Sequence, residues 1–274
     1  MKVKPMDITK LHNYASCSTE IKRQIENVAC KISSLLQSNL AGLYLHGSMV
    51  LDAFDENSSD LDMTGVICSP LTLPDKIELS SLLLALNNAP CPLDLELFVK
   101  DDLVSWRQNP KSDFYFSDYW AESYDIIALG GEHAADLLSA VFPGGEIASD
   151  MKVIKQSGIC LCGIPIDELF PDIPDGLFLK AVTSGICDFY VESDNVVQSS
   201  FLILQLCRIL SFKRTHQIMS KPKAAQWALN ELPSDFQPVI LTALYNKYGF
   251  GEKAPYSKED ALLFKSYVIE KVNE

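Results

Sequence analysis

The order of apolar and polar positions predicts mixed helices and strands in the first part of the chain. Apolar residues recur at helical spacing in residues 19–38 and 75–88, which indicates two amphipathic or apolar helices. Residues 40–45 and 60–67 are short and largely apolar, as strands are. Residues 91–100 alternate strictly, which is typical of a further strand.

The alternating strand has one apolar and one partly acidic face. Residues two apart on a strand point to the same side. One face carries Leu93, Leu95 and Leu97, and the other carries Asp94, Glu96 and Phe98. The first part of the chain is therefore predicted to be α/β or α+β, with acidic groups on one face of its sheet.

Beyond Pro143-Gly144-Gly145 the strand signals fade and helical periodicity dominates. Helices are predicted over residues 150–163, 176–190, 195–215, 221–230, 235–248 and 258–272. We therefore predict an α+β chain, with an α/β domain of mixed sheet over residues 1–150 and an all-α helical bundle domain over residues 151–274.

Composition narrows the class of protein. The 274 residues are 47% apolar and carry a formal net charge of −13 with only 23 Lys and Arg, which argues against a nucleic-acid binder and favours a cationic partner. The sequence has no signal-peptide run and no stretch of membrane-spanning length, so a cytoplasmic protein with no membrane partner is expected. The eight cysteines are scattered, which favours reduced thiols.

The stretch "LYLHGSMVLDAFDENSSDLDMTGVI", residues 43–67, contains the candidate chemistry. Asp60 and Asp62 are two apart on a predicted strand, so their carboxylates share a face. Two such charges are unfavourable unless a cation neutralises them. With an acid from residues 91–100 they form a candidate three-carboxylate site for Mg²⁺, which prefers carboxylate oxygens.

Gly47 and Ser48 follow a strand and open a short predicted helix. Glycine permits close approach of the backbone, and the following amides and hydroxyl can bind phosphate oxygens. Each motif alone is also explained by a solvated strand start. The joint order of strand, Gly-Ser, short helix, polar loop, Asp-x-Asp strand, helix and acidic strand is the layout of the nucleotidyltransferase (polymerase-beta-like) fold.

The chain resembles the aminoglycoside adenylyltransferases that modify streptomycin and spectinomycin. The resemblance covers most of the chain and is carried by "LHGSMVLDAFDENSSDLDMTGV", "CPLDLELFVKDDLVSWR", "GIPIDELFPDIP", "LCRILSFKRTHQIMSKPKAAQWALNELP" and "FQPVILTALYNKYG". It implies transfer of AMP from ATP to a drug hydroxyl with Mg²⁺, release of pyrophosphate, and a monomeric enzyme.

In the first domain the resemblance assigns metal binding to Asp60 and Asp62. It places Ser48 in the phosphate loop, where Gly47 precedes it, and we group Ser59 with these nucleotide-side residues. The family's catalytic base is a glutamate on the third strand. Its position here is Asp94, one methylene shorter, which we also count as a metal ligand.

Glu96 lies on the same face of that strand and is the alternative base. Both carboxylates are therefore kept as candidates for the proton acceptor, with Asp94 first. If neither carboxylate reaches the acceptor, turnover would be slow.

In the helical domain the resemblance assigns nucleotide contacts to Arg208 and Lys221. Their fixed positive charge suits a developing pyrophosphate. A surface ion pair for Arg208 and a solvent-exposed helix start for Lys221 are the structural alternatives. Tyr248 or Tyr245 is the candidate for stacking on adenine, and either could instead be part of the core.

Drug recognition is where the sequence departs from the family. The family's streptomycin-binding tryptophan and aspartate correspond to Phe189 and Asp194, and a further acid corresponds to Gln198. An interdomain tryptophan corresponds to Tyr119, which is beside Trp120. Aromatic faces and acids suit a cationic sugar, but such aromatics also simply pack. Loss of the indole makes spectinomycin the favoured substrate.

Three hypotheses follow. The first is an ATP- and Mg²⁺-dependent adenylyltransferase of a cationic aminoglycoside or aminocyclitol. The second is the same enzyme class with a non-antibiotic acceptor. The third is a degenerate homologue that binds ATP without transfer. The change at Asp94 would favour it, and the retained Asp60, Asp62, Arg208 and Lys221 argue against it.

Overall fold

The protein is described from a computed structural model. The structure describes residues 11–104, 112–129, 147–187, 196–249 and 252–274, together with residues 136 and 138. Contacts divide the chain into a unit of Leu11–Ile173 and a second unit that contains Pro174–Glu274. Among the described helices, none combines the length and the apolar character needed to cross a membrane.

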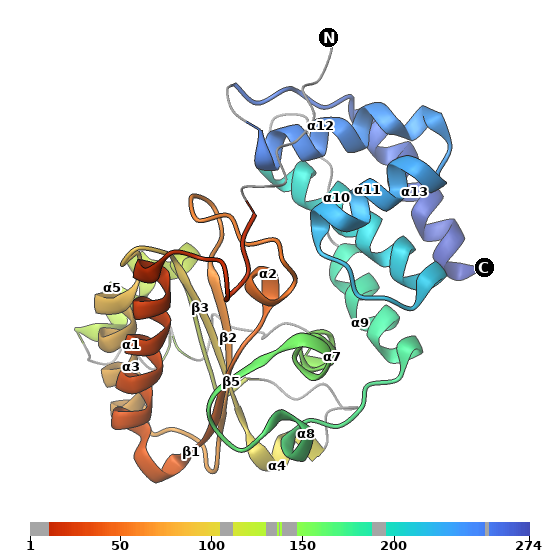
Figure 1. Ribbon diagram of the computed structural model, residues 1–274. Coiled ribbons are helices and arrows are strands. Elements are labelled where there is room, and N and C mark those ends of the chain that lie inside the picture. The colour runs from red at the N-terminus through yellow and green to blue at the C-terminus, as the bar shows by residue number, and fades with distance from the viewer. Residues whose placement is uncertain are drawn as a thin grey trace. The chain divides into compact units, whose positions relative to one another are not determined.

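The described part of the first unit contains a mixed five-stranded sheet in the order β4-β3-β2-β1-β5 (Figure 1). Its strands are β1 (Leu40–Leu45), β2 (Leu61–Ile67), β3 (Leu93–Val99), β4 (Phe114–Ser117) and β5 (Ile159–Gly163). Strands β2 and β3 are parallel, and the other pairs are antiparallel. Paired residues on neighbouring strands therefore point to the same face of the sheet, and successive residues of one strand point to opposite faces.

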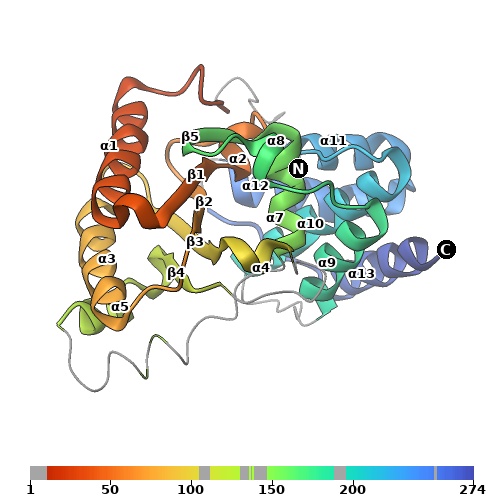
Figure 2. The same ribbon diagram turned by 90° about the horizontal axis from the view of Figure 1, so that it is seen from below.

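Three helices cover the apolar face of the sheet (Figures 1 and 2). They are α1 (Thr19–Leu36), α3 (Leu73–Leu86) and α5 (Ala121–Ala128). Helix α1 begins at the N-cap Ser18, and α3 begins with a capping box between Thr72 and Asp75. Apolar positions of the helices pack against Leu93, Leu95 and Leu97, so the predicted apolar face of the alternating strand is confirmed.

Helix α7 (Ile147–Ser157) lies on the opposite face of the sheet (Figures 1 and 2). Its buried residues are Ile147, Met151, Val153 and Ile154. The short helices of this unit are α2 (Gly47–Val50), α4 (Lys100–Val104) and α8 (Ile166–Leu169), and the 3₁₀ turns are η2 (Gln37–Asn39) and η4 (Asp118–Trp120). The acidic face of β3 therefore lies on the side of α7.

The second unit is helical in the residues that the structure describes. It contains α9 (Asp175–Cys187), α10 (Val196–Thr215), α11 (Lys221–Glu231), α12 (Gln237–Tyr248) and α13 (Lys258–Asn273), with the 3₁₀ turn η5 (Ser234–Phe236). Helix α10 packs against the four other helices and supplies many of the core residues. Ser220 and Pro222 mark the start of α11, as the sequence predicts.

The predicted fold class is confirmed, but three details differ. Residues 150–163 are not a continuous helix, because the chain leaves α7 at Ser157 and forms β5, which pairs with β1. The short apolar run "ICLCG" fits helical and strand periods alike, and pairing with β1 selects the strand. The division between the units consequently follows Ile173 and not residue 150. Strand β4 was not predicted.

The strand β5 also separates the two neighbouring cysteines. Cys162 pairs with Leu43 and Cys160 pairs with Tyr44, across a local shift in register. Leu43 and Tyr44 are adjacent on β1 and point to opposite faces, so the two thiols do too. Seven cysteines are free of disulfides: Cys17, Cys30, Cys68, Cys91, Cys160, Cys162 and Cys207.

Candidate active site

A tightly hydrogen-bonded polar loop carries the Asp-x-Asp motif. Oδ1 of Asp55 accepts the backbone N–H of Asn57 at 3.0 Å, and Oδ2 accepts the Ser58 hydroxyl at 2.9 Å. The Ser59 hydroxyl accepts the backbone N–H of Asp55 at 3.0 Å, and Ser59 is buried. Asp55 thus folds the loop on itself, and Asp60 leaves it at the start of β2 with an exposed side chain.

Gly47 brings the start of α2 against the second carboxylate. Its φ is +65°, a conformation that glycine adopts without strain. A Cβ built on Gly47 would lie 1.7 Å from Oδ2 of Asp62, so no other residue fits there without displacing Asp62. The backbone N–H of Ser48 donates to the same oxygen at 3.4 Å. The sequence signal of Gly-Ser and Asp-x-Asp therefore corresponds to one contact.

The parallel pairing of β2 and β3 places Asp62 directly opposite Asp94. The same pairing places Thr64 opposite Glu96, one step further along the strands. Neighbouring strands are about 4.8 Å apart, so the carboxylates of Asp62 and Asp94 share one end of the polar face. Asp94 is half-buried, whereas Glu96 is buried with 6% of its surface exposed.

Burial raises the pKa of Asp94 to about 7. The hydroxyl of Tyr115 donates to Oδ2 of Asp94 at 3.0 Å and opposes this shift, as does the hydroxyl of Ser117. The negative charges of Asp60 and Asp150 raise the pKa further. Asp94 therefore lies in a region of excess negative charge, where a cation would favour its ionised form.

Glu96 lies deeper on the same face. Burial raises its pKa to about 8, and the charge of Asp150 on α7 adds to the shift. Its Oε1 atom is buried without a hydrogen-bond partner. A buried carboxyl with this pKa is mostly protonated at pH 7, and little of it faces solvent.

His46 and Ser48 complete the polar face near Gly47. The Nε2 atom of His46 lies 3.0 Å from the Thr64 hydroxyl, and burial lowers the pKa of His46. The backbone N–H of His46 donates to the Asp62 carbonyl at 3.0 Å. The Ser48 hydroxyl is buried with no hydrogen-bond partner. The buried His46 is thus held by Thr64 and the backbone of Asp62.

The donors present fit a hard cation. Asp60, Asp62 and Asp94 offer the carboxylate oxygens that Mg²⁺ prefers. Among the described residues, no three His, Cys, Asp or Glu side chains converge on one point as a complete metal site. Magnesium in nucleotide enzymes commonly takes one or two carboxylates and completes its shell with phosphate and water. A pair of these aspartates therefore suffices.

The side chain of Asn87 fixes the start of β3. Its Oδ1 atom accepts the backbone N–H of Leu93 at 2.9 Å, and its Nδ2 atom donates to Oδ1 of Asp118 at 2.6 Å. Nδ2 of Asn88 donates to the same Asp118 oxygen at 2.7 Å. Asn87 therefore holds both the residue before Asp94 and the residue before Tyr119.

The predicted drug-contacting residues are only partly described. Tyr119 is 82% exposed, and its ring meets the ring of Trp120 edge to face with the ring centres 4.9 Å apart. Gln198 is half-buried on α10. Phe189 and Asp194 lie outside the described residues. An exposed aromatic pair is suited to stacking on a ligand, and the assignment stays a prediction.

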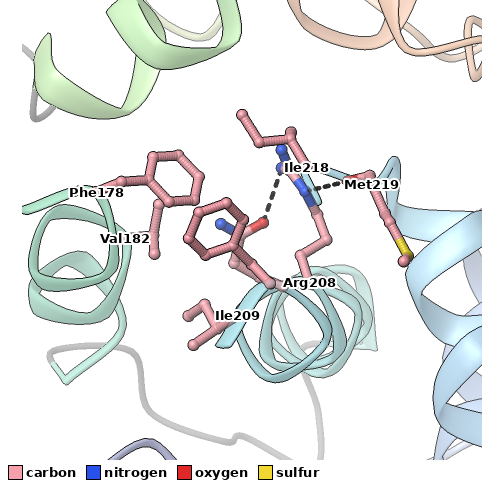
Figure 3. Close-up of a pocket in the computed structure, with 8 residues that line it drawn as sticks. Phe178, Val182, Arg208, Ile209, Ile218 and Met219 are labelled. Carbon is pink, nitrogen blue, oxygen red and sulfur yellow. Dashed lines mark hydrogen bonds between the residues drawn. The ribbon is translucent and has the colours of Figure 1, made fainter. Parts of the chain in front are cut away.

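The predicted nucleotide contacts of the helical unit are engaged within that unit. Arg208 donates from Nε to the Met219 carbonyl at 3.0 Å and from Nη1 to Oε1 of Gln205 at 3.1 Å (Figure 3). Nζ of Lys221 lies 4.2 Å from the ring centre of Phe201. Tyr248 is half-buried and packs against the helical core.

Arg208 lines a small, mainly apolar pocket of about 10 Å³, which has room for about one water. Its lining residues are Phe178, Val182, Gln205, Arg208, Ile209, Phe212, Ile218 and Met219 (Figure 3). The pocket itself is too small for a nucleotide. The guanidinium also connects the segment after α10 to that helix.

Two residues of the site were missed in the sequence. Tyr115 contacts Asp94, and Asp150 acts electrostatically on both Asp94 and Glu96. The alternation in "FYFS" is a strand signal that could have placed Tyr115 on the face of Asp94. Nothing in the sequence around Asp150 indicates that α7 lies on that face.

Known proteins similar to this chain support the assignment of the fold. Residues 168–271 match the family model described as the C-terminal domain of aminoglycoside adenylyltransferase. An aminoglycoside (3'')(9) adenylyltransferase of Escherichia coli is 25% identical over 253 residues, which cover 89% of this chain and 91% of that protein. A spectinomycin 9-adenylyltransferase of Enterococcus faecalis is 25% identical over 259 residues, covering 89% and 93%.

A solved structure gives the same result for the fold. The crystal structure of a spectinomycin adenyltransferase from Enterococcus, with ATP and spectinomycin, superposes with a TM-score of 0.74 at 22% identity. The match covers 92% of this chain and 99% of that one. The predicted resemblance to the aminoglycoside adenylyltransferases is thus confirmed.

Proposed function

We propose that this protein is an aminoglycoside O-adenylyltransferase, which transfers AMP from ATP to a hydroxyl of spectinomycin, streptomycin or both. Relatives named for this activity match nearly the full chain, and the solved relative contains ATP and spectinomycin. The reaction forms a bond between the drug oxygen and the α-phosphorus. The bond from the α-phosphorus to the bridging oxygen breaks, and pyrophosphate leaves.

The observation that carries the proposal is the register of β2 on β3. It brings Asp62, already in contact with Gly47, opposite Asp94. In the proposed reaction, Gly47 and the backbone N–H groups that follow it approach the phosphates of ATP. Ser48 and Ser59 are proposed to lie on the nucleotide side of the site as well. This combination of a glycine turn and opposed carboxylates suits phosphoryl transfer better than a solvated strand start does.

Asp94 is the proton acceptor in this proposal. It lies beside Asp62, whereas Glu96 lies one step deeper and is nearly sealed from solvent. A general base must reach the hydroxyl that it deprotonates, so position decides between two carboxylates of raised pKa. Glu96 then has a structural role beneath the reacting groups.

Asp60 and Asp62 would hold Mg²⁺, with Asp94 as a further ligand. The ion would neutralise charge on the triphosphate and on the carboxylates. Arg208 and Lys221 are proposed to stabilise the departing pyrophosphate, and Tyr248 to stack on adenine. Tyr119, Trp120 and Gln198 are proposed drug contacts, with Phe189 and Asp194 from outside the described residues.

We further propose that the enzyme is a cytoplasmic monomer that does not bind nucleic acid. The cytoplasm supplies the ATP that the reaction consumes. The net charge of −13 suits a cationic drug and disfavours a polyanion. Sedimentation of the purified chain would check the oligomeric state.

The test is pyrophosphate release and AMP–drug formation from MgATP with spectinomycin, with streptomycin and with no drug. Drug-dependent product formation with the expected mass is the predicted result. ATP binding without product from either drug would overturn the proposal. It would favour a different acceptor or a non-catalytic homologue.

A further inference from the structure

We propose that Tyr115 is a positioning residue that orients the carboxylate of Asp94 for proton transfer. The inference rests on the proposed function, since it concerns the same reaction. It assigns a role to a side chain on β4, a strand that carries none of the residues identified from the sequence. Tyr115 acts through Asp94 and does not itself exchange a proton with the substrate.

The geometry of the sheet aims Tyr115 at Asp94. Strand β4 pairs antiparallel with β3, so that Tyr115 lies opposite Glu96 and Ser117 lies opposite Asp94. All four side chains share the polar face, because opposed residues and residues two apart point the same way. The long phenol reaches diagonally along β3 and donates to Oδ2 of Asp94 at 3.0 Å.

The backbone that carries Tyr115 is fixed from the other face. Phe114 and Phe116 flank it and are buried in the apolar core. The ring of Phe116 packs 4.7 Å from that of Tyr124, and the Tyr124 hydroxyl donates to the backbone carbonyl of Tyr115. Little freedom is left for the strand, so the position of the phenol is determined before substrate binds.

The hydrogen bond orients the side chain of Asp94. It engages Oδ2 and restricts the rotation of the carboxylate. Asp94 has a short side chain with few rotamers, so loss of the Tyr115 donor should loosen its orientation.

The test is Tyr115→Phe, which removes only the hydroxyl. A hydrogen bond to a charged group contributes about 1.5–3 kcal/mol, so kcat for AMP transfer should fall roughly 10-fold or more. KM for ATP and for the drug should change by less than about twofold, because uniform binding is untouched. The matched control is Tyr44→Phe. The Tyr44 hydroxyl donates to the Ile164 carbonyl at 2.6 Å and not to Asp94.

A second arm repeats Tyr115→Phe in an Asp94→Ala background, using single-turnover formation of the AMP–drug product. A residue that acts through Asp94 should cause no further loss there, whereas a residue that only supports the sheet should cause the same loss again. An unchanged kcat in Tyr115→Phe would overturn the inference, as would a loss equal to that of Tyr44→Phe. If the wild type forms no product, the proposed function fails and the inference about Tyr115 fails with it. If the wild type is active, an unaffected Tyr115→Phe variant overturns the inference alone.

Discussion

The two units position their candidate residues in different ways. In the sheet unit, strand register and a single glycine bring Asp62, Asp94 and Gly47 together, and polar partners fix each group. In the helical unit, Arg208 and Lys221 contact groups of their own unit: a carbonyl, an amide and an aromatic ring. The first arrangement is set by backbone geometry, and the second by side-chain packing.

This difference also bears on which part of the chain the family model matches. The family model matches residues 168–271, where packing of five helices depends on many side chains. The carboxylate site depends on a few positions whose spacing alone is a weak motif. The family model therefore matches one unit, while the carboxylates of the proposed reaction lie in the other.

The largest expected effect is on kcat, and it should distinguish Asp94 from Glu96, the two carboxylates of β3. Asp94→Ala should lower kcat about 10²–10⁴-fold, the usual contribution of a general base. Glu96→Gln should keep kcat within a few-fold, because its side chain is buried one step away from Asp62. Steady-state AMP transfer measures both. A loss in Glu96→Gln that equals the loss in Asp94→Ala would contradict the assignment of the base.

The next effect compares one glycine from each unit. Gly47→Ala should lower AMP transfer at least about 100-fold, because the new Cβ displaces Asp62 and the φ of +65° is strained. Gly176→Ala on α9 is the control, since its Cβ would meet no atom within 4 Å. Equal activity of the two variants would show that the contact at Gly47 is unimportant for the reaction.

A smaller effect tests the packing role of Arg208. Arg208→Lys keeps the charge but loses the two-nitrogen geometry that reaches Met219 and Gln205. We expect a loss of about 1–2 kcal/mol, seen as a fall in Tm of several degrees, together with a raised KM for ATP. The control is Arg214→Lys, at an exposed arginine whose guanidinium lies 5.9 Å from the Trp227 ring centre. Unchanged Tm and KM would remove Arg208 from both roles.

A further effect, on stability and not on turnover, is a pH dependence of unfolding. The pKa of Glu96 is raised from 4.5 to about 8, so the folded state holds a proton that the unfolded state releases. Its contribution to stability is complete below pH 4.5 and is lost as the pH rises through about 8. Urea unfolding of the apo protein between pH 6 and 9 should therefore show falling stability.

Glu96→Gln should flatten that slope, because the amide does not titrate. Glu259→Gln, at an exposed position in the first turn of α13, should leave the slope unchanged. A wild-type slope that is retained in full in Glu96→Gln would show that other groups, including Asp94, cause the pH dependence.

Local patterns in the sequence determined most of the elements. The bounds of α1, β1 and α10 agree with the helical and strand spacing to within about two residues. Gly47 was identifiable as a turn, and Asp60 and Asp62 as a motif at the start of a strand. These features depend on residues close in sequence, whose conformational preferences and periodicity can be judged without knowing their distant neighbours.

The tertiary structure alone decided how these pieces meet. Pairing of β5 with β1 converted an ambiguous apolar run into a strand, and the register of β3 on β2 placed Asp94, not Glu96, beside Asp62. Packing of α7 and β4 brought Asp150 and Tyr115 to the same face. Each of these depends on contacts between residues far apart in the chain, and a shift of one residue in register would turn every side chain to the opposite face.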